Sequence, residues 1–251
     1  MRLHATEAGQ GKPLVLLHGL FGSGRNFGAV QRALATRFRV ITLDLRNHGA
    51  SPHTGGMAYA EMATDVLDTL TALQALPAVV LGHSMGGKVA MRAALDRPDA
   101  VTRLIVADIA PVTYPPHFRD YATAMLGLPD GTTRAQADTA LAGVVPDAAV
   151  RAFLLQNLVP GAAPPWRIGL AEIAAALPEI TGWHVPEDAR YAGPTMFVAG
   201  ETSDYIRPEH RDAIRTLFPA ARFVTLKHAG HWLHADNPEG FVAVVEAFAT
   251  E

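Results

Sequence analysis

The sequence predicts an α/β fold, in which a mostly parallel sheet carries helices on both of its faces. Short runs of apolar residues recur along the chain, and each run is flanked by turn residues. Continuous apolar runs are typical of strands buried on both faces, and strands that alternate with helices favour parallel pairing. The expected strands are Leu14–Leu17, Val40–Leu43, Val79–Leu81, Leu104–Ala107, Met196–Ala199 and Phe223–Leu226.

Helices are expected between these strands, where apolar residues return at the spacing of one helical face. The last helix has the clearest start, because Asn237 suits the N-cap position and Pro238 suits the first turn. The expected apolar faces are Phe27, Val30 and Leu34; Met62, Val66, Leu70 and Leu73; Val89, Ala93 and Leu95; and Phe241, Val244, Val245 and Phe248.

The alternation of strands and helices stops between Pro111 and Pro194. This stretch is rich in proline and alanine and contains short helical patches, but it has no clear strand. A linker would leave its many apolar side chains in solvent, whereas packed helices would bury them. We therefore expect one core domain built from residues 1–111 and 194–251, with a helical cap, or lid, inserted at residues 112–193.

Composition narrows the class of protein. The chain has 251 residues, of which 49% are hydrophobic and 18% charged, so it can bury a substantial core. It has no cysteine, which excludes disulfides, thiolate metal sites and a cysteine nucleophile. A net charge of −3 argues against a nucleic acid or an anionic membrane as partner. Without an apolar leader or a run long enough to span a bilayer, we expect a cytoplasmic protein that acts on a small molecule without an obligate protein partner.

The sharpest local signal runs from Val79 to Gly87, where an apolar run leads into Gly-His-Ser-Met-Gly and then into a helical pattern. In a nucleophile elbow, a serine sits on a strained turn between a strand and a helix. Small residues on either side let the backbone fold tightly enough to expose its hydroxyl. Gly82 and Gly86 stand at those positions around Ser84. We therefore predict that Ser84 is a nucleophile rather than the capping serine of a glycine-rich turn.

A serine nucleophile needs a histidine base and an acid that orients it, in the chain order serine, acid, histidine. His231 is the expected base, because it follows the last strand on a loop at the carboxyl edge of the sheet. His228 and His234 flank it, which raises a metal site as an alternative. A glycine-containing loop does not project three histidines onto one face. We therefore expect neither a metal nor a cofactor, and interpret the flanking histidines as polar loop residues.

Two acids compete for the third position of the triad. Asp108 ends the strand Leu104–Ala107, and Asp204 follows the strand Met196–Ala199. Both lie at carboxyl ends of strands, where the sites of open α/β sheets gather. Spacing alone therefore leaves both acids open.

An oxyanion hole would complete such a site. This architecture takes one backbone amide from the loop after an early strand, here Leu17 to Gly24, and the other from the residue after the nucleophile. We assign the amides of Leu20 and Met85. Phe21 remains the alternative to Leu20, because any residue can donate from its backbone amide and the side chain does not show which one does.

With these parts in place, the chain resembles the α/β-hydrolase superfamily and, within it, the YbfF-type esterases. The resemblance runs over nearly the whole length and is loosest in the expected cap. It implies a serine esterase with a helical lid that cleaves esters or thioesters of small to medium acyl chains. The motifs that carry it are HGLFGS (18–23), DLRNHGAS (44–51), LGHSMGGK (81–88), ADIAPV (107–112) and AGHWLHA (229–235).

The resemblance also bears on the acid. Most α/β-hydrolases place their aspartate after the penultimate strand, at the position that Ser203 takes here. YbfF-type esterases instead use an acid that matches Asp108, together with a serine matching Ser203 that also contacts the histidine. This implies a triad of Ser84, His231 and Asp108 supported by Ser203, with Asp204 as the reserve acid.

Other classes of protein match parts of the sequence. Gly82 to Lys88 fits the GxxxxGK of a P-loop, but Val89 stands where magnesium needs a hydroxyl. Gly19, Gly22 and Gly24 follow a strand as in dinucleotide sites, but their spacing departs from GxGxxG. A non-catalytic binding protein with this fold, and C–C bond hydrolysis or perhydrolysis by the same triad, stay open.

Several further side chains have two interpretations each. Arg46, Asn47 and His48 either bind substrate or form a loop held by its own hydrogen bonds. Lys88 is expected to be solvated or packed on the nucleophile helix rather than to bind phosphate. Cap side chains that either form its core or line the substrate pocket are Tyr114, Phe118, Met125, Trp166 and Trp183.

Overall fold

A computed structural model describes residues 1–116, 118–163 and 165–251 of the chain. At its centre is one sheet of seven strands in the order β1-β3-β2-β4-β5-β6-β7. β1 pairs antiparallel with β3, and the other neighbouring pairs are parallel. The strands are β1 (Ala5–Ala8), β2 (Pro13–Leu17), β3 (Arg39–Leu43), β4 (Ala78–His83), β5 (Val101–Ala107), β6 (Thr195–Gly200) and β7 (Ala221–Leu226).

All the predicted strands are present, as β2 to β7, and each is longer than its apolar run. Strand residues point alternately to the two faces of a sheet. Accordingly, Leu14 and Leu16 belong to one buried cluster, and Val15 and Leu17 to the cluster on the other face. β1 was not predicted, because its four residues form a half-exposed edge strand without an apolar run.

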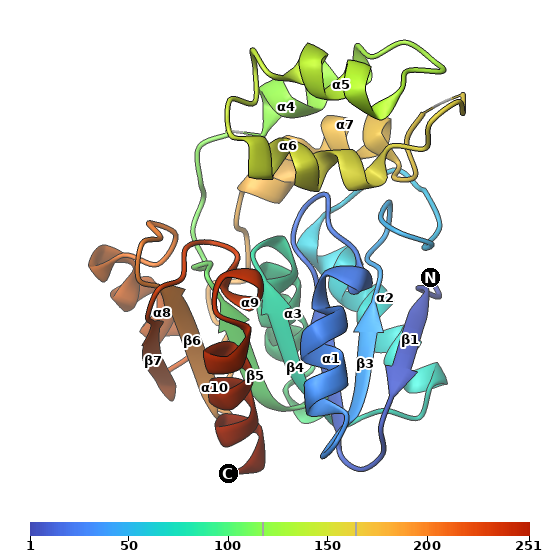
Figure 1. Ribbon diagram of the computed structural model, residues 1–251. Helices are drawn as coiled ribbons and strands as arrows, with labels where there is room; N and C mark the ends of the chain where they lie inside the picture. Colours follow the sequence, from blue (N-terminus) through green and yellow to red (C-terminus); the bar gives the residue numbers. More distant parts are fainter. Residues whose placement is uncertain (117, 164) are drawn as a thin grey trace.

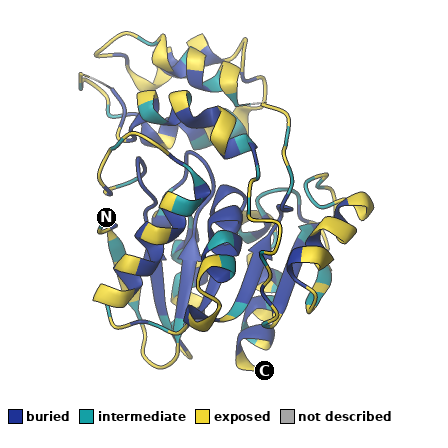
Figure 2. Ribbon diagram, turned by 180° about the vertical axis from the view of Figure 1, so that it is seen from behind, coloured by how far each residue is buried: buried dark blue, intermediate teal, exposed yellow. Residues whose placement is uncertain are grey.

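Helices cover both faces of the sheet (Figure 1). α1 and α10 pack together on one face, and α2, α3 and α8 cover the other. Figure 2 shows the buried strands between helices whose outer sides are exposed. These elements are α1 (Gly28–Leu34), α2 (Tyr59–Ala72), α3 (Met85–Asp96), α8 (Arg211–Leu217), α9 (Leu233–Asp236) and α10 (Pro238–Thr250), with 3₁₀ turns at Gly24–Phe27, Pro98–Ala100, Leu155–Asn157 and Pro208–His210.

The predicted start of the last helix is confirmed. Asn237 caps α10 by accepting a hydrogen bond at Oδ1 from the amide of Gly240 at 3.0 Å, and Pro238 is the first helical residue. Proline fits there because the first turn of a helix leaves its amides without intrahelical partners.

The stretch between β5 and β6 contains α-helices that lie over the carboxyl edge of the sheet (Figure 1). Within its described residues, one bridge between Leu158 and Trp166 is the only β pairing. Its buried apolar side chains join the core cluster on the α2 and α3 face, so this stretch is packed rather than a solvated linker. The boundaries 112 and 193 of a separate cap domain stay a prediction. The helices are α4 (Arg119–Leu126), α5 (Arg134–Leu141), α6 (Ala148–Leu154) and α7 (Leu170–Thr181).

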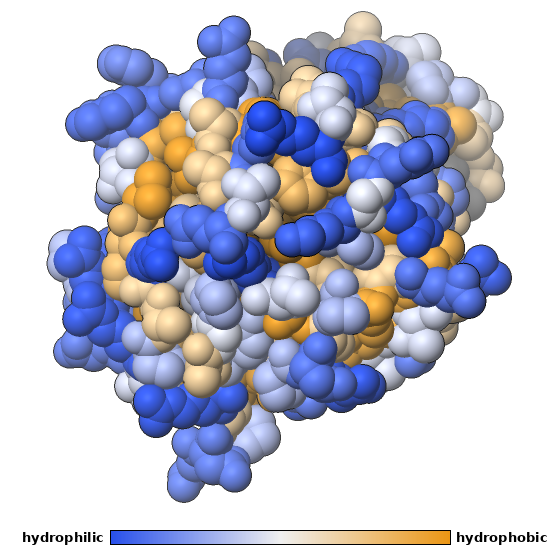
Figure 3. All heavy atoms as spheres, turned by 90° about the horizontal axis from the view of Figure 1, so that it is seen from below, coloured by the Kyte–Doolittle hydropathy of each residue, from blue (hydrophilic) through white to orange (hydrophobic). Residues whose placement is uncertain are grey.

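The face of the molecule opposite these helices carries hydrophilic side chains with smaller apolar patches between them (Figure 3). In the described part of the chain, no helix is both long and apolar enough to cross a membrane. Loops with polar side chains gather at the carboxyl edge of the sheet, beneath α4 to α7.

Candidate active site

Ser84 stands between β4 and α3, on a turn with a φ of 53° and a ψ of −122°. A serine adopts such a positive φ only where its surroundings hold it there. Gly82 and Gly86 permit the turn, because a Cβ on Gly82 would lie 2.0 Å from the carbonyl oxygen of Gly86, and one on Gly86 would lie 2.4 Å from that of Leu17. The strand, strained turn and helix of a nucleophile elbow are therefore all present.

The ring of His231 lies between Ser84 and Asp108. Its Nδ1 is 2.8 Å from Oδ2 of Asp108, and its Nε2 is 3.0 Å from Oγ of Ser84. Because a carboxylate only accepts hydrogen bonds, Nδ1 carries the proton, and Nε2 is left to accept from the Ser84 hydroxyl. The three residues form one hydrogen-bond chain, the geometry of a serine nucleophile with its base and an orienting acid.

Asp108 follows β5 and is fully buried. Its Oδ1 accepts from the amide of Gly200 at 3.0 Å, and its Oδ2 accepts from the Ser203 hydroxyl as well as from His231. These donors compensate for the water that a buried carboxylate loses. The resemblance implied that Ser203 contacts the histidine, whereas its hydroxyl donates to the acid.

The reserve acid, Asp204, is placed differently. It is exposed, and its side chain makes no hydrogen bond or ion pair with any described residue. Asp108 directly follows β5, a strand in the middle of the sheet, while Asp204 lies in the turn beyond β6. The structure therefore brings Asp108, and not Asp204, to the histidine.

The amides of Leu20 and Met85 donate to none of the described residues, and both residues line a cavity with Ser84. The amide of Phe21 instead donates to Nε2 of His48 at 3.1 Å. Phe21 is thus occupied, and of the two alternatives that the sequence left open, Leu20 has the free donor.

Two buried histidines hold the loop that carries Leu20. His18 donates from Nδ1 to the carbonyl of Gly19 at 2.8 Å and accepts at Nε2 from the amide of Leu45 at 3.0 Å. His48 accepts from Phe21 in the same way. Burial lowers the pKa of His48 to about 3 and also lowers the pKa of His18, so both rings stay neutral and keep one donor and one acceptor.

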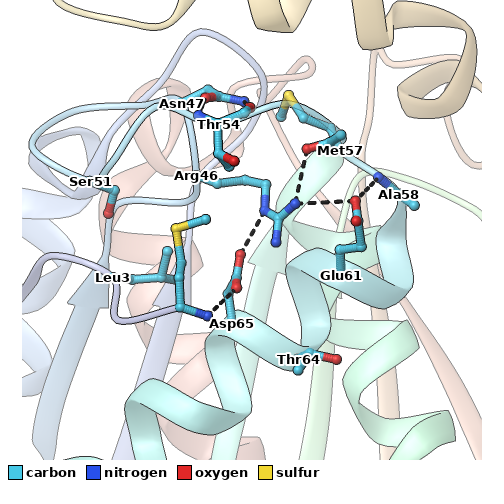
Figure 4. Close-up of polar contacts among 12 residues, drawn as sticks. Leu3, Arg46, Asn47, Ser51, Thr54, Met57, Ala58, Glu61, Thr64 and Asp65 are labelled. Atoms are coloured by element: carbon cyan, nitrogen blue, oxygen red, sulfur yellow. Dashed lines mark hydrogen bonds and ion pairs between the residues drawn. The ribbon is translucent and has the colours of Figure 1, made fainter.

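Arg46, weighed above as a substrate ligand, instead binds residues of its own loop and of helix α2. Its Nε donates to Asp65 at 2.6 Å, and its Nη1 donates to the Gly56 carbonyl at 3.0 Å and to Glu61 at 3.1 Å. Asp65 also accepts from the terminal amine of Met1 at 2.7 Å (Figure 4). Asn47 exchanges hydrogen bonds with Thr54 inside the loop, so bonds within the loop and to α2 occupy Arg46 and Asn47.

Sequence reasoning missed two neighbours of His231. His83 donates from Nε2 to the carbonyl of His231 at 2.7 Å, and the ring of Tyr205 stacks on the His231 ring with centroids 4.0 Å apart. Burial lowers the pKa of His83 well below its usual value, which keeps the ring neutral. The place of His83 beside Ser84 in the motif is a signal that could have found it, while nothing in the sequence marks Tyr205.

The two flanking histidines differ from each other. His228 is exposed at a φ of 57°, as a polar loop residue can be. His234 lies on α9 and packs against Phe27 with ring centroids 4.8 Å apart, and burial lowers its pKa to about 4. Interpreting His234 as a polar loop residue was therefore wrong. Among the described residues, no three His, Asp or Glu side chains cluster so as to hold a metal ion.

Ser84 opens onto two cavities of different size and lining. The larger holds about 290 Å³, lies beneath α4 and α6, and includes His231. The smaller holds about 40 Å³, extends towards the end of α7, and includes Lys88. The larger cavity is mostly apolar on the side of the covering helices, where Phe118, Tyr121, Val150, Phe153 and Leu154 line it.

Comparisons with known proteins agree with this fold. The model of the family described as the alpha/beta hydrolase fold matches residues 12–238. The sn-1-specific diacylglycerol lipase ABHD11 of Mus musculus is 43% identical over 246 residues, which cover 94% of this chain and 80% of that protein. Esterase YbfF of Escherichia coli (strain K12) is 35% identical over 243 residues, 95% of this chain and 93% of that protein.

A solved structure titled "Marine microorganism esterase" superposes with a TM-score of 0.93 at 34% identity, covering 98% of this chain and 99% of that one. The fold and site thus define an α/β-type hydrolase. The chain belongs to the α/β-hydrolase family, as the motifs predicted.

Proposed function

We propose that this chain is a serine hydrolase that cleaves carboxylic esters or thioesters of small molecules. The observation that carries the proposal is the hydrogen-bond chain from Ser84 through His231 to Asp108, at the wall of an apolar cavity of about 290 Å³. Relatives named as an esterase and a diacylglycerol lipase support the same class of reaction.

The first half of the reaction forms an acyl-enzyme. Ser84 Oγ attacks the ester carbonyl while Nε2 of His231 accepts the hydroxyl proton. The free amides of Leu20 and Met85 donate to the negative oxygen of the tetrahedral intermediate. His231 then gives its proton to the leaving alcohol, and the acyl group stays on Ser84.

The second half releases the acid. A water molecule takes the place of the alcohol beside His231, gives up a proton to Nε2 and attacks the acyl carbonyl. The bond between the acyl carbon and Ser84 Oγ then breaks, and Nε2 returns the proton to Oγ as the acid leaves. Asp108 stabilises the imidazolium in both halves and keeps the proton of the neutral ring on Nδ1. Ser203 fixes the carboxylate, and His83 fixes the backbone of His231, so both act as positioning residues.

The helices over the site are proposed to act as its lid, with residues 112–193 as the inserted segment. Apolar side chains of α4 and α6 form the roof of the larger cavity, so this segment sets which substrates fit. A cytoplasmic location and the lack of nucleic-acid, membrane or obligate protein partners stay predictions of the sequence.

The test is hydrolysis of p-nitrophenyl esters from acetate to dodecanoate, compared between the intact chain and Ser84→Ala. We expect turnover to fall by at least about 10⁴-fold in the variant, because the nucleophile is lost. Labelling by a fluorophosphonate should likewise require Ser84. If the intact chain neither cleaves any ester nor takes up the label, the proposal fails.

A further inference from the structure

Lys88 is a buried cation that the proposed reaction does not use. It lies on α3 one helical turn after Ser84 and is 1% exposed. The sequence left Lys88 either solvated or packed, and the structure shows that it is packed. A lysine is rarely this buried unless an opposite charge accompanies it.

The surroundings of Lys88 hold its ammonium but do not neutralise it. Nζ donates to the carbonyls of Gly182 at 2.7 Å and Thr181 at 3.2 Å, at the end of α7. The rings of Tyr59 and Tyr114 lie 5.5 Å and 5.0 Å from Nζ, close enough to attract a cation.

An ammonium has three N–H donors, so one donor of Lys88 is left. No described acidic side chain forms an ion pair with it. Burial alone lowers the pKa of Lys88 to about 7, and an anion bound beside it would raise that pKa.

Lys88 and Ser84 line the same small cavity. Its volume of about 40 Å³ restricts the acyl group to a short one. Because both side chains line this cavity, a short acyl group on Ser84 extends towards Lys88.

The two cavities fall on opposite sides of the bond that breaks. His231 must give its proton to the leaving oxygen, so the alcohol lies on the side of His231. His231 lines the larger cavity and not the smaller, whereas Leu20 of the oxyanion hole lines both. The alcohol therefore belongs in the larger cavity, and the acyl group in the smaller one.

We propose that the small cavity is an acyl pocket in which Lys88 binds a carboxylate, so that the enzyme favours esters of short dicarboxylic acids over esters of neutral acids. The proposal rests on the proposed function of Ser84 and names the class of acid that this function releases. Lys88 acts as a specificity residue and takes no part in the proton transfers.

Three butyl and butyryl esters test this proposal. Monobutyl succinate carries a carboxylate on its acyl group, its isomer 4-butyryloxybutanoate carries one on its alcohol, and butyl butyrate carries none. For the intact chain, we expect kcat/KM to be at least about tenfold higher for monobutyl succinate than for either other ester, because it alone places a charge beside Lys88. The release of alcohol is measured by gas chromatography, or by liquid chromatography for the charged alcohol.

Lys88→Met removes the charge and keeps most of the side-chain volume. We expect the preference for monobutyl succinate over butyl butyrate, taken as the ratio of their kcat/KM values, to fall by at least about tenfold, mainly through the KM of the succinate ester. Lys12→Met is the matched control, because Lys12 is exposed and lies far from the site in the loop before β2. It removes the same net charge and should leave all three rates unchanged.

A second measurement does not depend on how the variant folds. Succinate should inhibit butyl butyrate hydrolysis by the intact chain competitively, and at lower concentration than butyramide. Equal rates on the three esters with Ser84-dependent activity would overturn the acyl pocket and leave the proposed function standing. A preference for 4-butyryloxybutanoate would overturn it too, and inactivity on every ester would overturn both proposals.

Discussion

The carboxyl edge of the sheet and the helices above it are held together in different ways. At the edge, Ser84 and Asp108 have φ values of 53° and 52°, and buried side chains satisfy one another through specific hydrogen bonds. The helices α4 to α7 lie over it mainly through apolar packing, and α4 presents Leu126 to solvent. Reacting groups are thus fixed by backbone and hydrogen bonds, whereas the wall that meets the substrate is fixed by shape. Substitutions should accordingly abolish function at the edge and adjust it in the helices.

The largest expected loss of activity distinguishes Asp108 from Asp204. Asp108→Asn should lower kcat by about 10⁴-fold, because an amide at this position favours the wrong tautomer of His231. Asp204→Asn makes the same chemical change on an exposed side chain and should stay within about twofold. Steady-state kinetics on one p-nitrophenyl ester measures both, and the reverse order would assign the acid to Asp204.

Replacing one glycine by alanine in each region compares how tightly the two regions are packed. In Gly86→Ala, the new Cβ would meet the carbonyl oxygens of Leu17 and His18 at 2.4 and 2.5 Å, so we expect unfolding free energy to fall by at least about 3 kcal/mol. A Cβ on Gly143, after α5, would meet nothing within 4 Å. Gly143→Ala should therefore change stability by less than about 0.5 kcal/mol. Urea unfolding followed by circular dichroism tests both, and equal effects would contradict the comparison.

Acid should destabilise the edge rather than the helices above it, because α4 to α7 contain no histidine. The folded pKa of His48 is about 3, and those of His18 and His83 are lowered as well. Below about pH 6.5 such a histidine becomes protonated in the unfolded chain but stays neutral in the folded one. Stability is thus complete well above pH 6.5 and falls as the pH drops towards the folded pKa, by about 1.4 kcal/mol per pH unit for His48.

Urea unfolding at pH 7, 6 and 5 measures this slope. His48→Gln should make the slope shallower by the share of one histidine, whereas His53→Gln, at an exposed position, should leave it unchanged. An unfolding free energy that stays flat down to pH 5 would show that these rings are not held neutral.

The smallest effect belongs to the roof of the larger cavity. Phe153→Ala removes a ring that lines it, and should move the optimum of an alkyl acetate series towards longer alcohols by a few carbons, with changes of about three- to tenfold. Leu126→Ala, on an exposed side chain of α4, is the control and should not move it. A roof variant that instead loses activity on every ester would place Phe153 in the chemistry.

The sequence predicted the fold and the reacting residues, but not the contacts that hold these residues in place. Strands β2 to β7 and the elbow at Ser84 follow from local patterns, and family motifs favoured Asp108 over Asp204. The contacts that position these residues join distant loops, such as the amide of Phe21 with His48 and His83 with the His231 carbonyl. No local spacing encodes such pairs, and the short, polar β1 leaves no apolar run to read.

The order of the chain has a consequence for folding. Asp108 and His231 are 123 residues apart, and Ser84 and His231 are 147 apart. Contacts of such long range form late, because closing long loops costs entropy before the contacts repay it. His231 follows the edge strand β7, so the hydrogen-bond chain is complete only after that strand has docked. During refolding, fluorophosphonate labelling of Ser84 should therefore lag behind the recovery of helical circular dichroism and report the last assembly step.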